Sequence, residues 1–142
     1  ILFGYMMSSL QVTQAVAQTI AELQVNRWVV LAAINLLLLV AGCFLPPAAI
    51  ILMTTPILMP VITAAGFDPI WFGVILTINM ELGLITPPVG LNLFVINGIT
   101  PDVRLTTILK GAFPFMCCMV LAILILCVFP ELATWLPQKM MG

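Results

Sequence analysis

Apolar residues fill most of this chain in long runs, and short polar or proline-containing stretches separate the runs. The longest runs have about the 20 residues that an α-helix needs to cross the hydrocarbon core of a bilayer. The pattern therefore predicts an all-α integral membrane protein. Its apolar runs extend over residues 28–45, 48–65, 70–82, 90–98 and 111–129.

The first 25 residues follow a different pattern. Residues 1–7 have the character of the end of a membrane helix whose beginning is missing, so we expect a fragment of a longer protein. Over residues 10–23, apolar side chains repeat at helical spacing and glutamines occupy the opposite face. We expect this helix to lie along the membrane interface or against another subunit. Asn26, Arg27 and Trp28 would then anchor the chain at the membrane surface.

Residues 26–66 contain two apolar runs that meet at prolines. Gly42 and the pair Pro46-Pro47 end the first run. Two arrangements remain open: two full spans, or a re-entrant helical hairpin that enters and leaves on one side of the membrane, with residues 42–47 at its tip. A turn that reaches water usually carries Asp, Asn, Ser or Lys. None of these occurs at this turn, which favours the hairpin.

Residues 67–99 cannot form one continuous helix, although they are mostly apolar. Pro87 and Pro88 each lack an N–H, and the residue before a proline is driven away from the α region. Gly83 and Gly90 flank the prolines and add conformational freedom. We therefore predict a discontinuous membrane helix.

The two parts of this helix should be apolar half-helices over residues 70–82 and 90–98, with residues 84–89 unwound between them. Asp68 is placed to cap the first half-helix. Unwound backbone is tolerated at membrane depth only where it is buried in protein or lines a water-filled cavity. Broken helices are typical of transporter binding sites. The alternative is a proline-kinked helix that binds no ligand.

Residues 100–142 are predicted to hold a cytoplasmic loop, one last span and a periplasmic tail. Arg104 and Lys110 make this loop the most basic of the chain, and basic loops favour the cytoplasmic side. The last span, over residues 111–129, then runs outward. The interfacial tail after Pro130 lies in the periplasm.

Composition supports the membrane class and excludes others. Of the 142 residues, 63% are hydrophobic and 6% are charged, whereas a soluble domain of this size must cover its surface with polar groups. The net charge of −1, with four scattered basic residues, argues against nucleic-acid binding. The chain has no His, no nucleophile beside a base and no phosphate loop, so we predict no enzyme activity. The four cysteines lie in apolar runs and are interpreted as small hydrophobic residues.

Uncharged oxygen atoms dominate the polar groups at membrane depth, and carbonyls freed at the break add to them. Neutral oxygen ligands suit a hard monovalent cation such as sodium. The half-helix that begins near Gly90 offers free N–H groups and a positive dipole end to an anionic group. The pattern thus predicts coupled binding of a cation and a carboxylate. The side chains concerned are Thr54, Thr55, Asn79, Thr86, Asn92 and Asn97.

Glu81 is the only acid well inside an apolar segment. Carboxylates at membrane depth are energetically costly and usually functional, so Glu81 is a candidate proton carrier or coupling-ion ligand. The alternative is a structural hydrogen bond to Thr77, Asn79 or the unwound backbone. We expect Asn35 to make a helix–helix hydrogen bond instead of binding a ligand.

Several motifs, in order along almost the whole chain, resemble the large membrane subunit of tripartite ATP-independent periplasmic (TRAP) transporters. The sequence at the break, GLITPPVGLNLF over residues 83–94, strongly resembles the signature of that subunit's second repeat. The resemblance implies the C-terminal part of the subunit: the second inverted repeat of an elevator-type transporter, with a re-entrant helical hairpin and a discontinuous helix. The supporting motifs are NLLLLVAG (35–42), PILMP (56–60), GFDPIWFG (66–73) and FP…WLP (129–137).

The resemblance also implies an activity, which is sodium-driven import of an organic acid such as a C4-dicarboxylate or sialic acid across the bacterial inner membrane. The implied partners are a small membrane subunit, a periplasmic substrate-binding protein and the lipid bilayer. No cofactor is implied beyond sodium as the coupling ion. The choice of acid, sodium or proton coupling, and a fused or separate small subunit stay open.

A hairpin followed by an unwound Thr-Pro-Pro helix is also similar to the pattern of sodium–dicarboxylate symporters. That likeness implies that the hairpin tip and the loop over residues 86–92 share one sodium site. At the tip, Pro46-Pro47 replaces a Ser-Asn-Thr-like sequence, so we expect backbone carbonyls as the ligands there. The implied site residues are Gly42, Pro46, Thr86, Pro87, Pro88, Gly90 and Asn92, with Glu81, Thr54 and Asn79 as further candidates.

Two other functions remain as alternatives. One is a dicarboxylate symporter that works without a binding protein, which a neighbouring gene for such a protein would argue against. The other is a non-transporting membrane scaffold. Unwound backbone within the membrane speaks against the scaffold, which would have no use for it.

Overall fold

The structure, a computed structural model, describes residues 26–141 together with Ala15, Gln18 and Glu22. Apart from these three residues, the predicted helix end and amphipathic helix of residues 1–25 lie outside the described residues. All regular secondary structure in residues 26–141 is helical, which confirms the predicted all-α class. The helices are α3 (Arg27–Phe44), α4 (Pro47–Ala64), α5 (Pro69–Ile85), α6 (Leu91–Ile99), α7 (Leu105–Val128) and α8 (Glu131–Met141).

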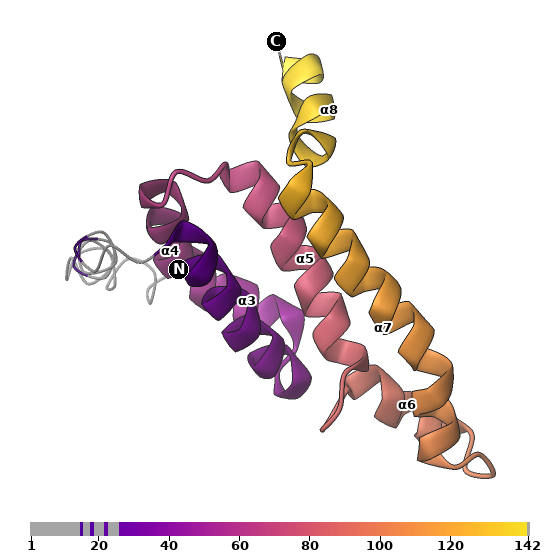
Figure 1. Cartoon of the computed structure of the whole chain (residues 1–142). Helices are drawn as coiled ribbons and strands as arrows, with labels where there is room; N and C mark the ends of the chain where they lie inside the picture. Colours follow the sequence, from indigo (N-terminus) through magenta and orange to yellow (C-terminus); the bar gives the residue numbers. More distant parts are fainter. Residues whose placement is uncertain (1–14, 16–17, 19–21, 23–25, 142) are drawn as a thin grey trace.

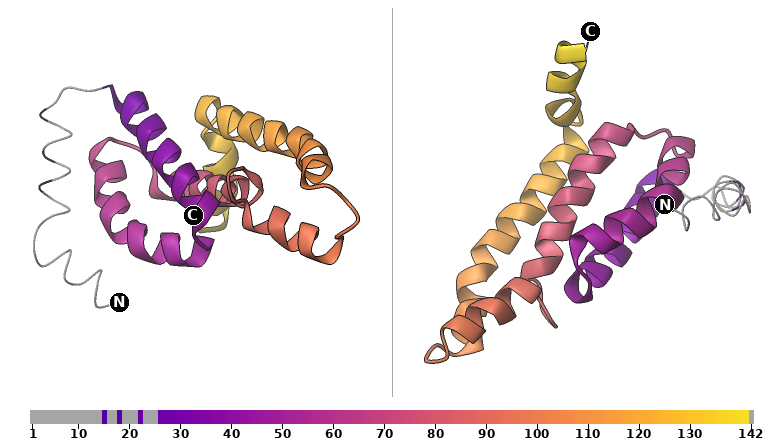
Figure 2. Two further views of the ribbon diagram at one scale, coloured as in Figure 1. Left: turned by 90° about the horizontal axis from the view of Figure 1, so that it is seen from below. Right: turned by 180° about the vertical axis from the view of Figure 1, so that it is seen from behind.

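Three of these helices, α3, α4 and α7, are long and apolar enough to cross a membrane, and α5 is a shorter apolar helix. Helices of this length and composition are consistent with the predicted integral membrane protein. α3 and α4 are joined by a tight turn, and α5 lies between this hairpin and α7 (Figure 1). α6 continues beyond the end of α5, and α7 returns alongside both helices (Figures 1 and 2).

α5 is the central helix of the described chain, because it contacts α3, α4, α6, α7 and α8. It is apolar over most of its surface, as expected for a helix largely surrounded by others, and Thr77 and Glu81 are its exposed polar side chains. Its buried side chains include Trp71, Phe72 and Ile75, which pack with Leu31 and Leu38 of α3. By contrast, no residue of α7, which the structure describes in full, is buried. Large exposed apolar side chains on α7 are the expected surface of a protein surrounded by lipid or further protein.

The turn between α4 and α5 is fixed by two caps. Gly66 has a φ of 83°, and the Phe67 N–H donates to the Ile62 carbonyl at 3.1 Å, which closes the end of α4. The Asp68 carboxylate then accepts from the N–H groups of Ile70 and Trp71 at 2.7 and 3.2 Å. The predicted cap at Asp68 is confirmed.

The break follows the prediction in position but is shorter. α5 continues to Ile85, so Leu84 and Ile85 are helical, contrary to the prediction that residues 84–89 are unwound. The reason is that Pro87 only prevents its own N–H bond, whereas the Thr86 N–H still donates to the Gly83 carbonyl at 3.2 Å. Non-helical backbone is confined to residues 86–90.

One boundary near the C-terminus was predicted wrongly. α7 begins at Leu105 instead of residue 111, so Lys110 belongs to the helix and the loop before it is shorter than predicted. Arg104 has extended backbone at the position just before α7. The tail after Pro130, predicted only as an interfacial segment, forms the helix α8.

Candidate functional site

The tip of the α3–α4 hairpin lies against the break between α5 and α6 (Figures 1 and 2). Gly42 and Gly83, both buried, bring the backbones of α3 and α5 together there. A Cβ atom added to Gly83 would lie 2.8 Å from the Gly42 carbonyl carbon and 2.9 Å from its Cα atom. Contacts this short do not occur, so only a glycine at 83 permits this approach.

Cys43 forms a second contact between the tip and the break. Its thiol donates to the Pro87 carbonyl oxygen, with a sulfur–oxygen distance of 3.9 Å. Sequence reasoning treated Cys43 only as a small hydrophobic residue and missed this contact. The signal that could have found it is its place beside Gly42, within the predicted tip.

α3 and α5 run in the same direction toward the site. Asn35 and Asn79 are 44 residues apart in sequence, as are Cys43 and Pro87, and each pair is hydrogen-bonded across the two helices. The C-terminal ends of α3 and α5, where carbonyls point outward, therefore meet the N-terminal ends of α4 and α6. Such an arrangement offers negative dipole ends to a cation and positive ones to an anion.

Backbone carbonyls converge on Gly90, where α6 begins. Gly90 has a φ of 58°, and a Cβ atom there would lie 3.1 Å from the Thr86 carbonyl oxygen and 3.3 Å from that of Leu84. The Leu84 carbonyl faces Pro87 and Pro88 three and four residues on, neither of which has an N–H to donate. These oxygens are neutral, hard ligands of the kind that a monovalent cation requires.

Thr86 supplies a hydroxyl oxygen at the same place. It is half-buried and donates to the Leu82 carbonyl at 2.6 Å, which leaves its lone pairs free to accept or to bind a cation. Thr86 also lines an apolar cavity of about 390 Å³ between α3, α5 and α7, together with Leu39 and Phe113.

The other predicted residues of the break and tip are more exposed. Pro46, Pro87, Pro88 and Asn92 all lie on the surface of the described chain. Asn92, in the first turn of α6, forms no hydrogen bond with a described residue. The structure thus places Gly42 and Pro87 in the contact between the tip and the break, and Thr86 beside Gly90, whereas the Asn92 and Pro46 side chains are exposed.

Asn79 lies in the contact between α3 and α5. It is 2% exposed, and its amide donates to the Asn35 backbone carbonyl at 2.8 Å and to the Asn35 side-chain oxygen at 3.2 Å. The Asn35 amide in turn donates to the Leu31 carbonyl at 2.9 Å. The predicted helix–helix hydrogen bond of Asn35 is confirmed, and Asn79 is its partner.

Two threonines of α4 behave differently from each other. Thr54 donates to the Ile50 carbonyl of its own helix at 2.7 Å. The Thr55 hydroxyl is buried and has no hydrogen-bond partner among the described residues. Pro56 follows directly, and Pro56 and Pro60 each remove one hydrogen bond from α4.

Glu81 lies on another face of α5. It is exposed and lines a cavity of about 340 Å³ between α5 and α7, beside Thr77 and Cys118. The alternative in which Thr77 or Asn79 bonds to Glu81 is wrong for the described chain, because Thr77 donates to the Gly73 carbonyl and Asn79 to Asn35. Glu81 forms no hydrogen bond with a described residue.

Comparison with known proteins gives one consistent family. A family model described as the DctM component of the tripartite ATP-independent periplasmic transporter matches residues 1–132. The C4-dicarboxylate TRAP transporter large permease protein DctM of Pseudomonas aeruginosa is 39% identical over 137 residues, covering 96% of this chain and 32% of the relative.

Relatives named for other substrates also match almost the whole chain. The sialic acid TRAP transporter large permease protein SiaM of Vibrio cholerae is 34% identical, over 99% of this chain and 33% of the relative. The ectoine TRAP transporter large permease protein TeaC of Halomonas elongata is 34% identical, over 94% of this chain and 31% of the relative. The chain thus spans about a third of the length of these curated relatives.

Proposed function

The chain belongs to the family of the DctM component of TRAP transporters, which are proteins of the inner membrane. On this basis we propose that it forms the part of a large permease subunit that holds a sodium and substrate site. The whole transporter would import an organic acid by secondary active transport, driven by a sodium gradient. A periplasmic binding protein would deliver the acid, and a small membrane subunit would complete the transporter.

One observation carries this proposal: the hairpin tip packs against unwound backbone whose carbonyl oxygens converge on Gly90. The carbonyls of Leu84 and Thr86, with the Thr86 hydroxyl, are neutral ligands suited to sodium. The residues described contain no group of three or more His, Cys, Asp or Glu side chains that would instead suggest a transition metal. The N-terminal end of α6 beside this group favours a carboxylate.

The substrate class follows from the same end of α6. The relatives named above are described by C4-dicarboxylate, sialic acid and ectoine, which all carry a carboxylate. A carboxylate near the first N–H groups of α6, with sodium bound to the carbonyls behind it, would couple the two ligands electrostatically.

We also propose that α3 and α4 form a re-entrant hairpin in the second inverted repeat of an elevator-type transporter. In support, the tip meets the chain at the α5–α6 break, and α6 extends further in the same direction (Figure 1). Membership in the TRAP family argues against the two alternatives, a symporter without a binding protein and a passive scaffold.

The test is sodium-dependent uptake by the full transporter in proteoliposomes, with the binding protein and labelled acids. Thr86→Val keeps the side-chain shape but removes the oxygen, and the apparent sodium affinity should fall roughly tenfold or more, since about 1.4 kcal/mol corresponds to tenfold. Thr77→Val, on the same helix but bonded only to Gly73, is the matched control and should retain normal sodium dependence.

Binding of the periplasmic protein should be unchanged in the Thr86 variant. Replacing Pro87 by Ala and Pro88 by Leu should be more damaging, because it allows the helix to close. Normal uptake and sodium dependence in both this variant and Thr86→Val would show that the break is only a kink. Uptake that is independent of both sodium and the binding protein would reject the proposed function as a whole.

A further inference from the structure

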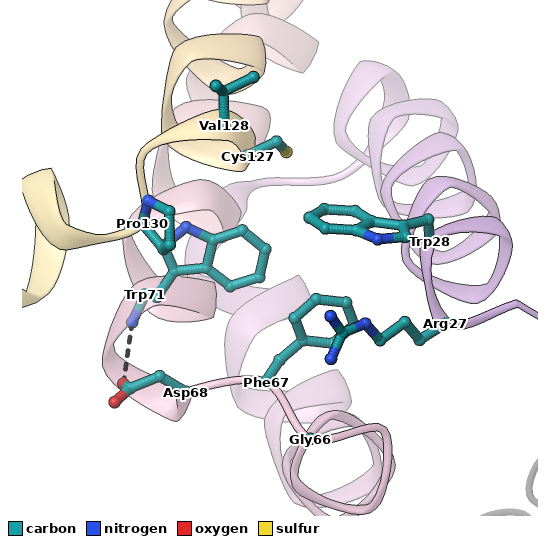
Figure 3. Close-up of a pocket in the computed structure, with 9 residues that line it drawn as sticks. All are labelled: Arg27, Trp28, Gly66, Phe67, Asp68, Trp71, Cys127, Val128 and Pro130. Carbon is teal, nitrogen blue, oxygen red and sulfur yellow. Dashed lines mark hydrogen bonds between the residues drawn. The ribbon is translucent and has the colours of Figure 1, made fainter.

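A second pocket lies at the opposite end of the hairpin from the break, where α3 and α5 begin and α7 ends. Its volume is about 380 Å³. Figure 3 shows Arg27 and Trp28 on one side of it, Trp71 and Pro130 on the other, and Asp68 at its edge. Helix ends that carry tryptophans are typical of the membrane–water interface. This end of the helices therefore has the residue composition that is typical of the interface, where lipid headgroups lie.

Arg27 has unused hydrogen-bonding capacity in this pocket. Its guanidinium carbon lies 5.6 Å from the centre of the Phe67 ring and 5.8 Å from that of Trp28. Stacking on aromatic rings holds a guanidinium without using its N–H groups, which lie in its plane. The guanidinium forms no hydrogen bond or ion pair with any described residue, so its N–H groups remain available to a phosphate.

Asp68 gives the pocket a negative group as well. One carboxylate oxygen caps α5 by accepting from the N–H groups of Ile70 and Trp71, and no described group bonds to the other oxygen. Arg27 and Asp68 line the same pocket without forming an ion pair. The Arg27 cation and the Asp68 anion, held apart in one pocket, are complementary to a zwitterionic ligand, which carries both charges.

The walls of the pocket are apolar and lead to the surface of α7. Trp71 is held in place because its indole N–H donates to the Leu126 carbonyl at 2.7 Å, and Phe67 stacks on it at a centroid distance of 5.1 Å. Cys127 and Val128 continue the wall along α7, none of whose residues is buried. If the headgroup of a lipid occupied the pocket, its acyl chains would therefore run along an apolar helix.

We propose that this pocket binds the headgroup of a zwitterionic aminophospholipid. Arg27 holds the phosphate, Asp68 accepts hydrogen bonds from the ammonium group, and the aromatic side chains pack against the glycerol and the first acyl carbons. The site ties the outer ends of α3, α5 and α7 to the bilayer. It does not depend on the sodium site at the break.

The experiment is native mass spectrometry of the full transporter, delipidated in detergent and then given phosphatidylethanolamine, phosphatidylcholine or phosphatidylglycerol. Arg27→Gln should lower the affinity for phosphatidylethanolamine about tenfold or more and remove one tightly bound lipid, because it loses a charge-assisted contact to phosphate. Arg104→Gln, which removes a cation at the other end of the described chain, is the control and should bind lipid as the wild type does.

Asp68→Asn tests the ammonium contact separately. Asparagine is as good an N-cap as aspartate, so α5 should keep its cap while the charge is lost. The wild type should prefer phosphatidylethanolamine to phosphatidylcholine, whose quaternary ammonium cannot donate a hydrogen bond, and Asp68→Asn should bind the two equally.

Folding of each variant is checked by thermal unfolding without lipid, and Arg27→Lys serves if Arg27→Gln does not fold. Lysine keeps the charge but not the planar fork, so this variant should bind several-fold more weakly than wild type. Equal lipid loss in the Arg27 and Arg104 variants would overturn the proposal. The proposal would also be overturned if inorganic phosphate alone protected the transporter against thermal unfolding. The same holds if Arg27→Gln bound lipid normally but bound the periplasmic protein poorly.

Discussion

Replacing Gly83 by Ala should push the hairpin tip away from the break, whereas replacing Gly42 by Ala should not. The new Cβ at 83 would lie 2.8 Å from the Gly42 carbonyl carbon, and backbone atoms cannot rotate away as a side chain can. Restoring an ordinary contact of 3.4 Å requires a displacement of roughly 0.6 Å. A Cβ at 42 would already lie 3.4 Å from the Gly83 Cα atom, so it fits.

The expected size of the effect follows from the cost of overpacking, which is roughly 1–3 kcal/mol. Alanine is a better helix former than glycine by about 1 kcal/mol, but both positions lie within helices, so this gain cancels when the two variants are compared. If the tip moves to relieve the overlap, the apparent sodium affinity of Gly83→Ala should fall roughly 5- to 150-fold.

The assay is sodium-dependent uptake of a labelled acid by the reconstituted transporter, with thermal unfolding measured in parallel. Gly73→Ala, on the same helix with no atom within 4 Å of the added Cβ, is a second control and should behave as wild type. Wild-type sodium dependence in Gly83→Ala would refute the link between tip position and ion binding. Equal losses at Gly42 and Gly83 would show that backbone freedom matters there, and that crowding does not.

Three further predictions concern topology and packing. Asp102→Cys, in a background without native cysteines, should react with an impermeant reagent only from the cytoplasmic side; labelling from outside intact cells would invert the topology. Leu45→Cys, in the hairpin turn, should become less reactive when sodium binds, and equal labelling with and without sodium would support two full spans. Asn79→Leu removes the hydrogen bonds to Asn35, so it should destabilise the protein by about 1–3 kcal/mol in thermal unfolding and leave sodium affinity unchanged. A selective loss of sodium affinity would instead place Asn79 in the site.

Local signals in the sequence predicted the features that depend on neighbouring residues. The turn at Gly66 and the cap at Asp68 follow from residue types that act within one turn of helix. The break at Pro87 and Pro88 follows from missing N–H groups. The end of α5 was misplaced by three residues, because a helix continues as long as its remaining N–H groups find partners, as that of Thr86 does.

Contacts between distant segments could not be predicted in the same way. The bonds of Cys43 to Pro87 and of Asn79 to Asn35 join residues 44 positions apart, and apolar periodicity carries no information on which helices become neighbours. The convergence of the Leu84 and Thr86 carbonyls on Gly90 depends on backbone angles at the break, which composition does not determine. The family resemblance identified the region, and the structure supplied the geometry.

The contacts between α3 and α5 also make the two helices of the hairpin unequal: α3 is held rigidly, and α4 is more flexible. α3 is tied to α5 at Asn35, Gly42 and Cys43 along one side of its length. α4 has two internal prolines that weaken its own hydrogen-bond ladder, and the hydroxyl of Thr55 has no partner in the described chain. Any bending that admits or releases a ligand at the tip would therefore be concentrated in α4, while α3 and α5 move together as one rigid body.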